Sequence, residues 1–128
     1  IWEGTTNVLS LDMLRAIEKE NGLPAFQEFA DGILSDIGIS ELEQQKRVLS
    51  AKVNTIVTFI KNTKNKDNRI AAARDIAFYI AEVTIALLWM DFLQSNSGKA
   101  NYLNTLNYWL QYKMNDNSLQ AAAQLELV

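Results

Sequence analysis

The sequence of 128 residues contains no cysteine and no histidine. Without cysteine, disulfide bonds and thiolate metal sites are excluded. Without histidine, the commonest general base, imidazole metal ligands and every serine–histidine–aspartate arrangement are excluded as well. Any acid–base chemistry near neutral pH must therefore come from Asp, Glu, Lys or Tyr side chains.

Positive charge is also scarce, since 12 Lys and Arg residues stand against 15 Asp and Glu, giving a net charge of -3. A surface with this balance does not attract phosphate backbones, so we expect no nucleic-acid partner. The acidic residues Asp12, Asp36 and Glu43 are too dispersed to indicate a metal site. We therefore expect no metal ion in this chain.

Glycine and proline are rare, with five and one in the chain, and their positions divide the sequence. Breaks are indicated at residues 21–24 and 97–98, and a polar connector at 62–68. Between them apolar residues recur at helical spacing, with neither strand alternation nor an internal repeat. The pattern predicts an all-α fold, an antiparallel bundle of four to five helices with short loops. The expected helices cover about residues 6–20, 24–34, 41–62, 68–94 and 100–114, with a further short helix at 118–128.

The fourth expected helix is the most apolar segment of the sequence. From residue 76 to residue 90 it is apolar almost all round, with Glu82 as its only charge. Such a helix is normally the central one of a bundle. The run is too short to cross a bilayer and is flanked by charges, so we expect no membrane span. Glu82 itself is expected at an edge of the bundle or beside a Lys or Arg.

Three further local patterns give testable expectations. Val8, Leu11 and Leu14 are spaced to share one face of the first helix. Ser40 followed by Glu43 is the signature of a capping box. The aromatic residues of the second half are expected to be core and helix-contact material: Phe78, Tyr79, Trp89, Phe92, Tyr102, Tyr108, Trp109 and Tyr112.

The run Trp2-Glu3-Gly4-Thr5-Thr6 places a carboxylate beside an aromatic ring, a glycine and two hydroxyls. A carboxylate shielded by an aromatic ring loses solvation, so its pKa rises and it accepts protons better near neutral pH. Gly4 allows close approach of a ligand, and the free N–H groups of a first helical turn can hold an anion. A simpler interpretation also fits, in which a threonine caps the helix and Glu3 favours its positive end.

The same residues resemble the Tyr-Glu-Gly-Thr loop near the C-terminus of acyl-CoA dehydrogenases, with Trp2 where tyrosine or phenylalanine is common. The continuation Leu-Ser-Leu-Asp-Met-Leu-Arg-Ala resembles the long-tailed, AidB-like branch of that family, whose members carry extra helices after this loop. A weaker similarity covers residues 73–78. The resemblance implies that residues 1–20 hold the catalytic loop and first helix and that residues 21–128 form a helical C-terminal extension.

The resemblance also implies roles for individual residues. Glu3 corresponds to the base that removes the α-proton of an acyl-CoA, and Trp2 would line the acyl pocket. Gly4, Thr5 and Asn7 stand where the family contacts its cofactor, FAD. The implied reaction gives trans-2-enoyl-CoA as the β-hydrogen leaves as hydride to the flavin, with electron-transfer flavoprotein or oxygen as acceptor. The isolated fragment is expected to be inactive, because it lacks most of the flavin- and substrate-binding regions.

Two other functions stay open on the sequence. The long tail is compatible with a non-catalytic helical module for oligomerisation or interaction, and a homo-oligomer is expected. The second open function is that of an AidB-like flavoprotein, although the excess of acidic over basic residues disfavours contact with DNA. The start at Ile1 lacks a Met, a basic segment and an apolar leader, which we interpret as an internal cut. We expect an intracellular location: mitochondrial or peroxisomal in a eukaryote, cytoplasmic in a bacterium.

Overall fold

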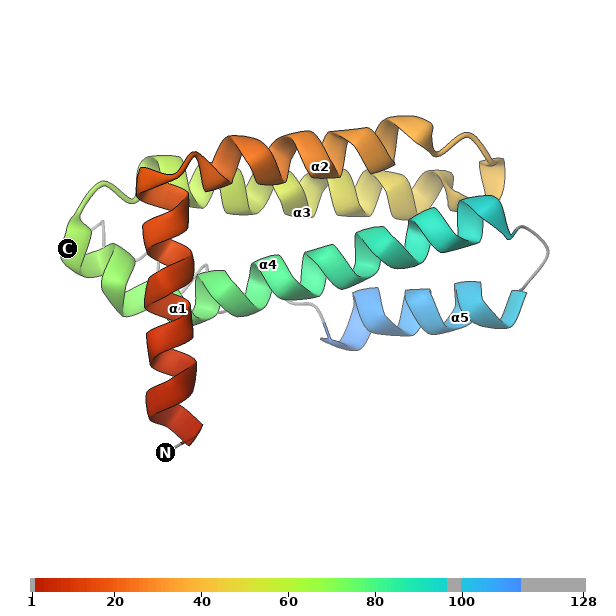
Figure 1. Ribbon diagram of the computed structural model, residues 1–128. Helices are drawn as coiled ribbons and strands as arrows, with labels where there is room; N and C mark the ends of the chain where they lie inside the picture. Colours follow the sequence, from red (N-terminus) through yellow and green to blue (C-terminus); the bar gives the residue numbers. More distant parts are fainter. Residues whose placement is uncertain (1, 97–99, 114–128) are drawn as a thin grey trace.

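A computed structural model describes residues 2–96 and 100–113 of the chain, and Figure 1 shows its arrangement. The described residues form helices and short connections, without a strand. The five α-helices are α1 (Trp2–Lys19), α2 (Gly22–Asp36), α3 (Glu43–Asn62), α4 (Lys66–Ser95) and α5 (Ala100–Tyr108). A 3-10 turn, Ser40–Leu42, precedes α3, and a π-helical turn, Trp109–Lys113, follows α5. The predicted all-α class is confirmed; the helix expected at 118–128 lies outside the described residues.

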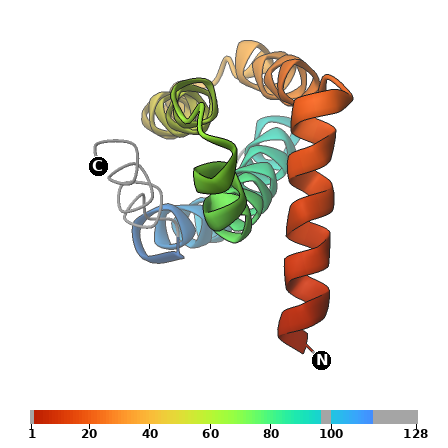
Figure 2. The same cartoon turned by 90° about the vertical axis from the view of Figure 1, so that its left-hand side faces the viewer.

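Helices α2 to α5 run alternately up and down a common axis, as the predicted antiparallel bundle requires (Figure 1). Helix α1 instead runs across that axis at one end of the bundle (Figures 1 and 2). Helix α4 lies in the middle and contacts α1, α2, α3 and α5. Its central position follows from its composition, because an almost entirely apolar helix must be covered on several sides.

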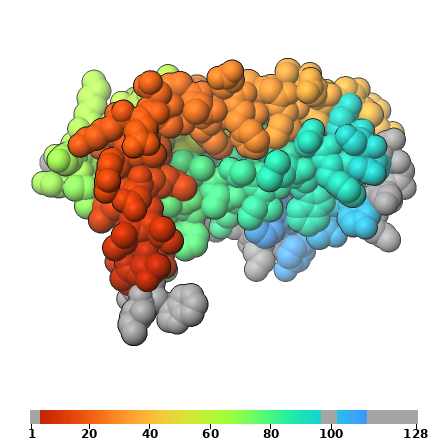
Figure 3. All heavy atoms as spheres, in the orientation of Figure 1, coloured from red at the N-terminus to blue at the C-terminus, as the bar shows by residue number. Residues whose placement is uncertain are grey.

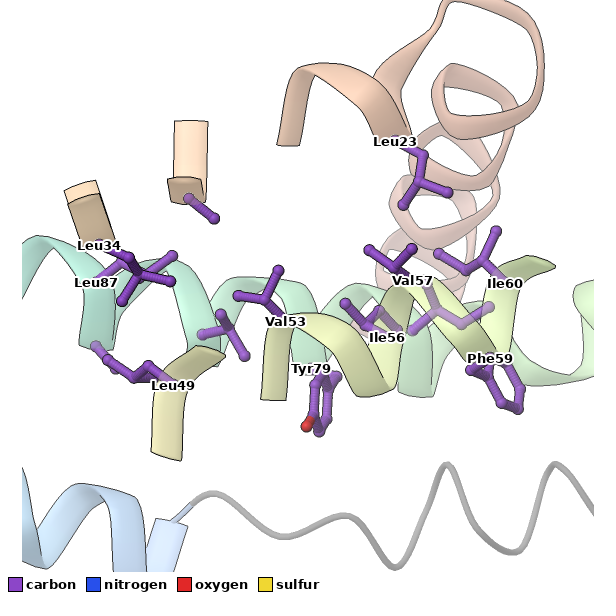
Figure 4. Packing of buried hydrophobic residues seen from close by; sticks show 14 of the residues in the cluster. Leu23, Leu34, Leu49, Val53, Ile56, Val57, Phe59, Ile60, Tyr79 and Leu87 are labelled. Carbon is purple, nitrogen blue, oxygen red and sulfur yellow. The ribbon is translucent and has the colours of Figure 1, made fainter. Parts of the chain in front are cut away.

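The core lies between α2, α3 and α4, and Figure 4 shows their buried side chains pointing toward one another. Apolar residues of α3 spaced three and four apart form one buried row, the α3 stripe: Leu49 and Ile56 are inaccessible to solvent, and Val53 and Ile60 nearly so. Helix α4 contributes a further set of buried side chains to this core. Its inaccessible residues recur at three- and four-residue intervals, as one face of a helix demands: Val83, Ala86, Leu87 and Met90.

Helix α1 differs from the sequence-based expectation in its start and in its buried face. It begins at Trp2, about one turn before residue 6. Val8 and Leu11, expected in the interface with Leu14, are exposed, whereas Ser10 and Leu14 are buried. The Ser10 hydroxyl donates to the backbone oxygen of Thr6 at 2.8 Å, so its burial leaves no unsatisfied polar group. A small residue at this position allows α1 to lie close against the helix that it crosses.

The turn between α1 and α2 depends on two residues that tolerate unusual backbone geometry. Asn21 has a φ of 56°, in the left-handed region that asparagine adopts more readily than most residues. At Gly22 an added Cβ would lie 2.9 Å from the backbone oxygen of Ala16, closer than real Cβ contacts. The Asn-Gly pair therefore permits the tight packing that sets α1 across the bundle.

Arg69, in the first turn of α4, ties three helices together. Its guanidinium donates to the backbone oxygens of Thr63 and, at 3.0 Å, Ile60, both at the C-terminal end of α3. The same guanidinium forms an ion pair with Glu18 of α1 at 3.3 Å. A cation at a helix C-terminus satisfies carbonyls that have no partner within the helix. Arg69 thereby holds the end of α3 and the end of α1 against α4.

The capping box expected at Ser40 and Glu43 is wrong. Ser40 opens a 3-10 turn, and its hydroxyl lies 3.5 Å from the carboxylate of Glu41. The residue that caps α3, Leu42, has no side-chain cap hydrogen bond. The side-chain cap is found instead at α4, where the Asn65 amide oxygen accepts from the backbone N–H of Asn68 at 3.1 Å.

Replacing Asn65 by alanine should lower the free energy of unfolding by about 1 kcal/mol, because the first turn of α4 loses its acceptor. Urea denaturation followed by circular dichroism measures this change. Asn54→Ala is the matched control, since Asn54 is exposed in the middle of α3 and should show no such loss. Equal effects of the two substitutions would mean that the cap contributes nothing to stability.

By length and composition alone, α4 could cross a membrane, which the shorter run of residues 76–90 did not indicate. Nine of its residues are buried against the other helices, as in the central helix of a bundle. This feature is weak support for a span, since the core helices of bundles meet the same criteria. The absence of a membrane span stays a prediction.

Candidate functional site

The residues that the sequence singles out for catalysis lie in the first two turns of α1. This end of the helix projects beyond the bundle, on the side away from α2 and α3 (Figures 1 and 3). Gly4, Thr5 and Asn7 are exposed, and a Cβ added at Gly4 would meet no atom within 4 Å. The backbone of Trp2 and Glu3 belongs to the same first turns of α1. All five candidates therefore share one projecting helix end.

These residues are helical rather than part of a loop, which corrects the expectation of a catalytic loop ahead of the helix. The first four N–H groups of an α-helix have no carbonyl partner within the helix. With the helix starting at Trp2, the N–H groups of Glu3 and Gly4 belong to that set. They point toward the helix N-terminus, where the dipole favours a negatively charged or polarised oxygen. The change from loop to helix therefore adds hydrogen-bond donors to the candidate site.

The projecting end supplies one wall of a site and not an enclosed cavity. Two hollows lined by described residues lie elsewhere, one beside α2 and one between α3 and the end of α5. No three acidic side chains gather into a possible metal site within residues 2–96 and 100–113. Substrate binding in this region would therefore need surfaces from outside these helices.

The hollow between α3 and α5 has a volume of about 410 Å³ and is lined largely by amide side chains: Gln44, Gln45, Val48, Asn107, Leu110 and Gln111. Gln45 is buried, and its Nε2 donates to the Asn107 Oδ1 at 2.8 Å. Its Oε1 accepts no hydrogen bond from any residue in the described part of the chain. One signal for this site is readable in the sequence, because Gln45 is a polar residue on the otherwise apolar α3 stripe.

Glu82 lies half-buried on α4, as its place in an apolar run required. Desolvation raises the pKa of the Glu82 carboxyl above its usual value, and the nearby positive charge of Lys52 partly opposes that rise. The expectation of a basic neighbour agrees with this position. Trp109 donates its indole N–H to the backbone oxygen of Glu82 at 3.4 Å, which attaches the end of α5 to α4.

The aromatic residues of the second half are not all core. Tyr79 is buried and Trp89 and Trp109 pack partly against the core, whereas the others on described positions are exposed: Phe78, Phe92, Tyr102 and Tyr108. Phe92 and Tyr102 form an edge-to-face pair with ring centroids 5.5 Å apart. The guanidinium of Arg74 lies 5.5 Å from the centroid of the Phe78 ring. The side chain of Tyr112 lies outside the described residues.

Comparison with known proteins relates the chain to the C-terminal domains of acyl-CoA dehydrogenases. The curated protein "Acyl-CoA dehydrogenase family member 11" of Caenorhabditis elegans is 33% identical over 105 residues. The alignment covers 76% of this chain but 17% of that protein, so the chain spans about one sixth of its relative's length. No solved structure matches the chain significantly. The sequence model of the family described as "Acyl-CoA dehydrogenase 11 C-terminal domain-like" matches residues 22–125, and the chain therefore belongs to that family of acyl-CoA dehydrogenase C-terminal domains.

Proposed function

We propose that this chain is the C-terminal part of an FAD-dependent acyl-CoA dehydrogenase in which Glu3 is the catalytic base. The parent protein oxidises an acyl-CoA to the trans-2-enoyl-CoA. The carboxylate of Glu3 takes the α-proton, and the β-hydrogen leaves with its electron pair as a hydride. The electron pair of the broken α C–H bond becomes the new double bond between the α- and β-carbons.

The backbone at the start of α1 assists this step. An N–H group of the first turn, such as that of Glu3, donates to the thioester carbonyl and stabilises the negative charge that develops on its oxygen. The helix dipole acts in the same direction. The ring of Trp2 borders the acyl chain.

FAD would be held in part by Gly4, Thr5 and Asn7, and it supplies the acceptor for the β-hydrogen. These residues fit the role by two observations: the side of Gly4 is open to the approach of a ligand, and Thr5 and Asn7 are exposed beside it. A helix N-terminus also suits an anionic group such as a pyrophosphate. The remaining contacts to FAD would come from the rest of the parent protein, so the isolated chain is expected to be inactive.

The observation that carries this proposal is the Glu-Gly-Thr motif at a projecting, solvent-exposed helix end in a chain of this family. A capping function alone would not require an aromatic residue, a carboxylate and an open glycine together. Electron-transfer flavoprotein or oxygen would accept the electrons from the reduced enzyme.

The purified parent protein should carry the visible absorbance of oxidised flavin, and anaerobic addition of a saturated acyl-CoA should bleach it. The 128-residue chain alone should neither bind flavin nor oxidise the thioester. Absorbance spectroscopy of the two proteins, with mass spectrometry of the enoyl-CoA product, tests both points. A parent that binds flavin but is not bleached by acyl-CoAs of any chain length would contradict the dehydrogenase proposal.

A non-catalytic interaction module is the second candidate function, and it is favoured by the large apolar side chains exposed along α4. The two functions are compatible in one protein, because the catalytic motif and the apolar surface lie on different helices. Assignment to the AidB-like branch is a finer proposal, which rests on residues 9–16 of the sequence.

A further inference from the structure

One side of α4 carries an unusual row of large apolar side chains in contact with solvent. Its members are between 42% and 52% exposed and recur at helical intervals: Ile70, Phe78, Ile85, Leu88 and Phe92. We call this row the α4 apolar face. Arg74, stacked on Phe78, is the only charged residue within the row. Contiguous apolar surface of this kind on a soluble domain marks a site of interaction.

The described helices leave most of this face uncovered. Helices α1, α2, α3 and α5 all contact α4, and α5 reaches the edge of the face, where Tyr102 packs on Phe92. In the view along the bundle, no helix of the described residues occupies the space below α4 between α1 and α5 (Figure 2). Within residues 2–96 and 100–113, the α4 apolar face is therefore uncovered apart from the contact at Phe92.

Helix α1 also has exposed apolar side chains on the half that projects from the bundle: Val8, Leu9 and Leu11. With about 3.6 residues per turn, these three lie on the sides of α1 turned away from the buried Ser10 and Leu14, so they do not continue the α4 apolar face. The projecting end of α1 extends past α4 in the same direction as the uncovered space (Figure 2). The Glu3 motif therefore lies at the outer end of α1, beside that space.

We infer that the α4 apolar face docks against an apolar helical surface of the dehydrogenase body, the part of the parent protein that holds the flavin. This inference rests on the proposed function, which requires the end of α1 to reach the body. A body that meets residues 3–7 must also lie within the angle between α1 and α4. More than four fifths of the relative's length lies outside the aligned part, which leaves ample chain for such a body.

The composition of the α4 apolar face defines the matching surface. A row of apolar side chains that includes one cation can be buried against aliphatic and aromatic side chains. The charged groups of a strongly charged partner would lose their solvation there without compensation. Burial of each half-exposed Leu, Ile or Phe then contributes to holding the domain in place. The docked domain would keep α1, and with it Glu3, in a fixed position relative to the flavin.

Thiol labelling provides a direct test, because the chain contains no native cysteine. Leu88→Cys places a thiol in the α4 apolar face, and Thr58→Cys places one at an exposed position of α3 as the control. Each variant is made in the 128-residue chain and in the full-length parent, and the labelled peptide is quantified by mass spectrometry. Docking should slow labelling at residue 88 at least about tenfold in the parent relative to the short chain, and leave residue 58 unchanged.

Three results would overturn the inference. Equal labelling rates at residue 88 in both proteins would mean that the face is open in the parent. Slow labelling already in the short chain, together with a doubled mass in solution, would mean that a second copy covers the face. Protection in the parent that falls on dilution would assign the face to another subunit. Flavin bleaching, measured on the same preparations, reports the proposed function separately, so either idea can fail alone.

Discussion

Replacing Glu3 by glutamine in the parent dehydrogenase is expected to lower kcat by a factor of about 10² to 10⁴ while flavin stays bound. The substitution keeps the size of the side chain and its hydrogen-bonding capacity but removes the proton acceptor. Because the flavin contacts assigned here involve Gly4, Thr5 and Asn7, the flavin absorbance should be retained. Anaerobic stopped-flow bleaching with a saturated acyl-CoA measures the effect on the chemical step.

Glu20→Gln is the matched control, because Glu20 is exposed and lies one residue beyond the other end of the same helix. It changes the net charge by the same amount, so any general electrostatic effect would appear in both variants. Bleaching at the parental rate in Glu3→Gln would assign the base to another residue. The helix-capping interpretation of Glu3 would then be the better one.

Replacing Leu87 by alanine is expected to lower the free energy of unfolding of the chain by about 2 to 5 kcal/mol. Leu87 is fully buried on α4 and lies among the core side chains from α2 and α3. The loss combines the transfer free energy of the removed atoms with that of the cavity left behind. Urea or thermal denaturation followed by circular dichroism measures the change.

The adjacent residue gives a sharp comparison. Leu88 is 52% exposed, so Leu88→Ala in the 128-residue chain should change the stability by less than about 0.5 kcal/mol. The same substitution should cost more in the parent if the α4 apolar face is docked there. Equal losses for Leu87→Ala and Leu88→Ala in the short chain would show that the burial pattern of α4 is wrong.

The fold was largely predictable because helical periodicity is a local property. The α3 stripe of Leu49, Val53, Ile56 and Ile60 is buried as its spacing indicates, and α4 is central as its composition requires. The incorrect predictions lie at helix ends, where alternative capping arrangements compete. At Ser40 a 3-10 turn replaced the capping box, whereas Asn65, which the sequence pattern did not single out, caps α4.

The candidate site was predictable in its residues but not in its geometry. The Glu-Gly-Thr motif is readable as sequence, and its roles in catalysis and flavin binding stay predictions. Only the structure shows that these residues begin a helix. Their projection from the bundle depends on where α1 crosses α4. The unsatisfied Oε1 of Gln45 and its partner Asn107 could not be paired from sequence, since they come from different helices.

By itself the sequence determined the helical class, the order and approximate bounds of the helices, and the resemblance to acyl-CoA dehydrogenases, because each depends on residues close together in the chain. Only the tertiary structure decided which apolar residues are buried. Val8, Leu11 and Phe78 have the same chemical character as Leu14 and Leu87, yet they remain exposed because no helix in the described part of the chain packs over them. Burial is a property of how helices are arranged in space, and the crossing of α1 over α4 sets which apolar side chains face solvent.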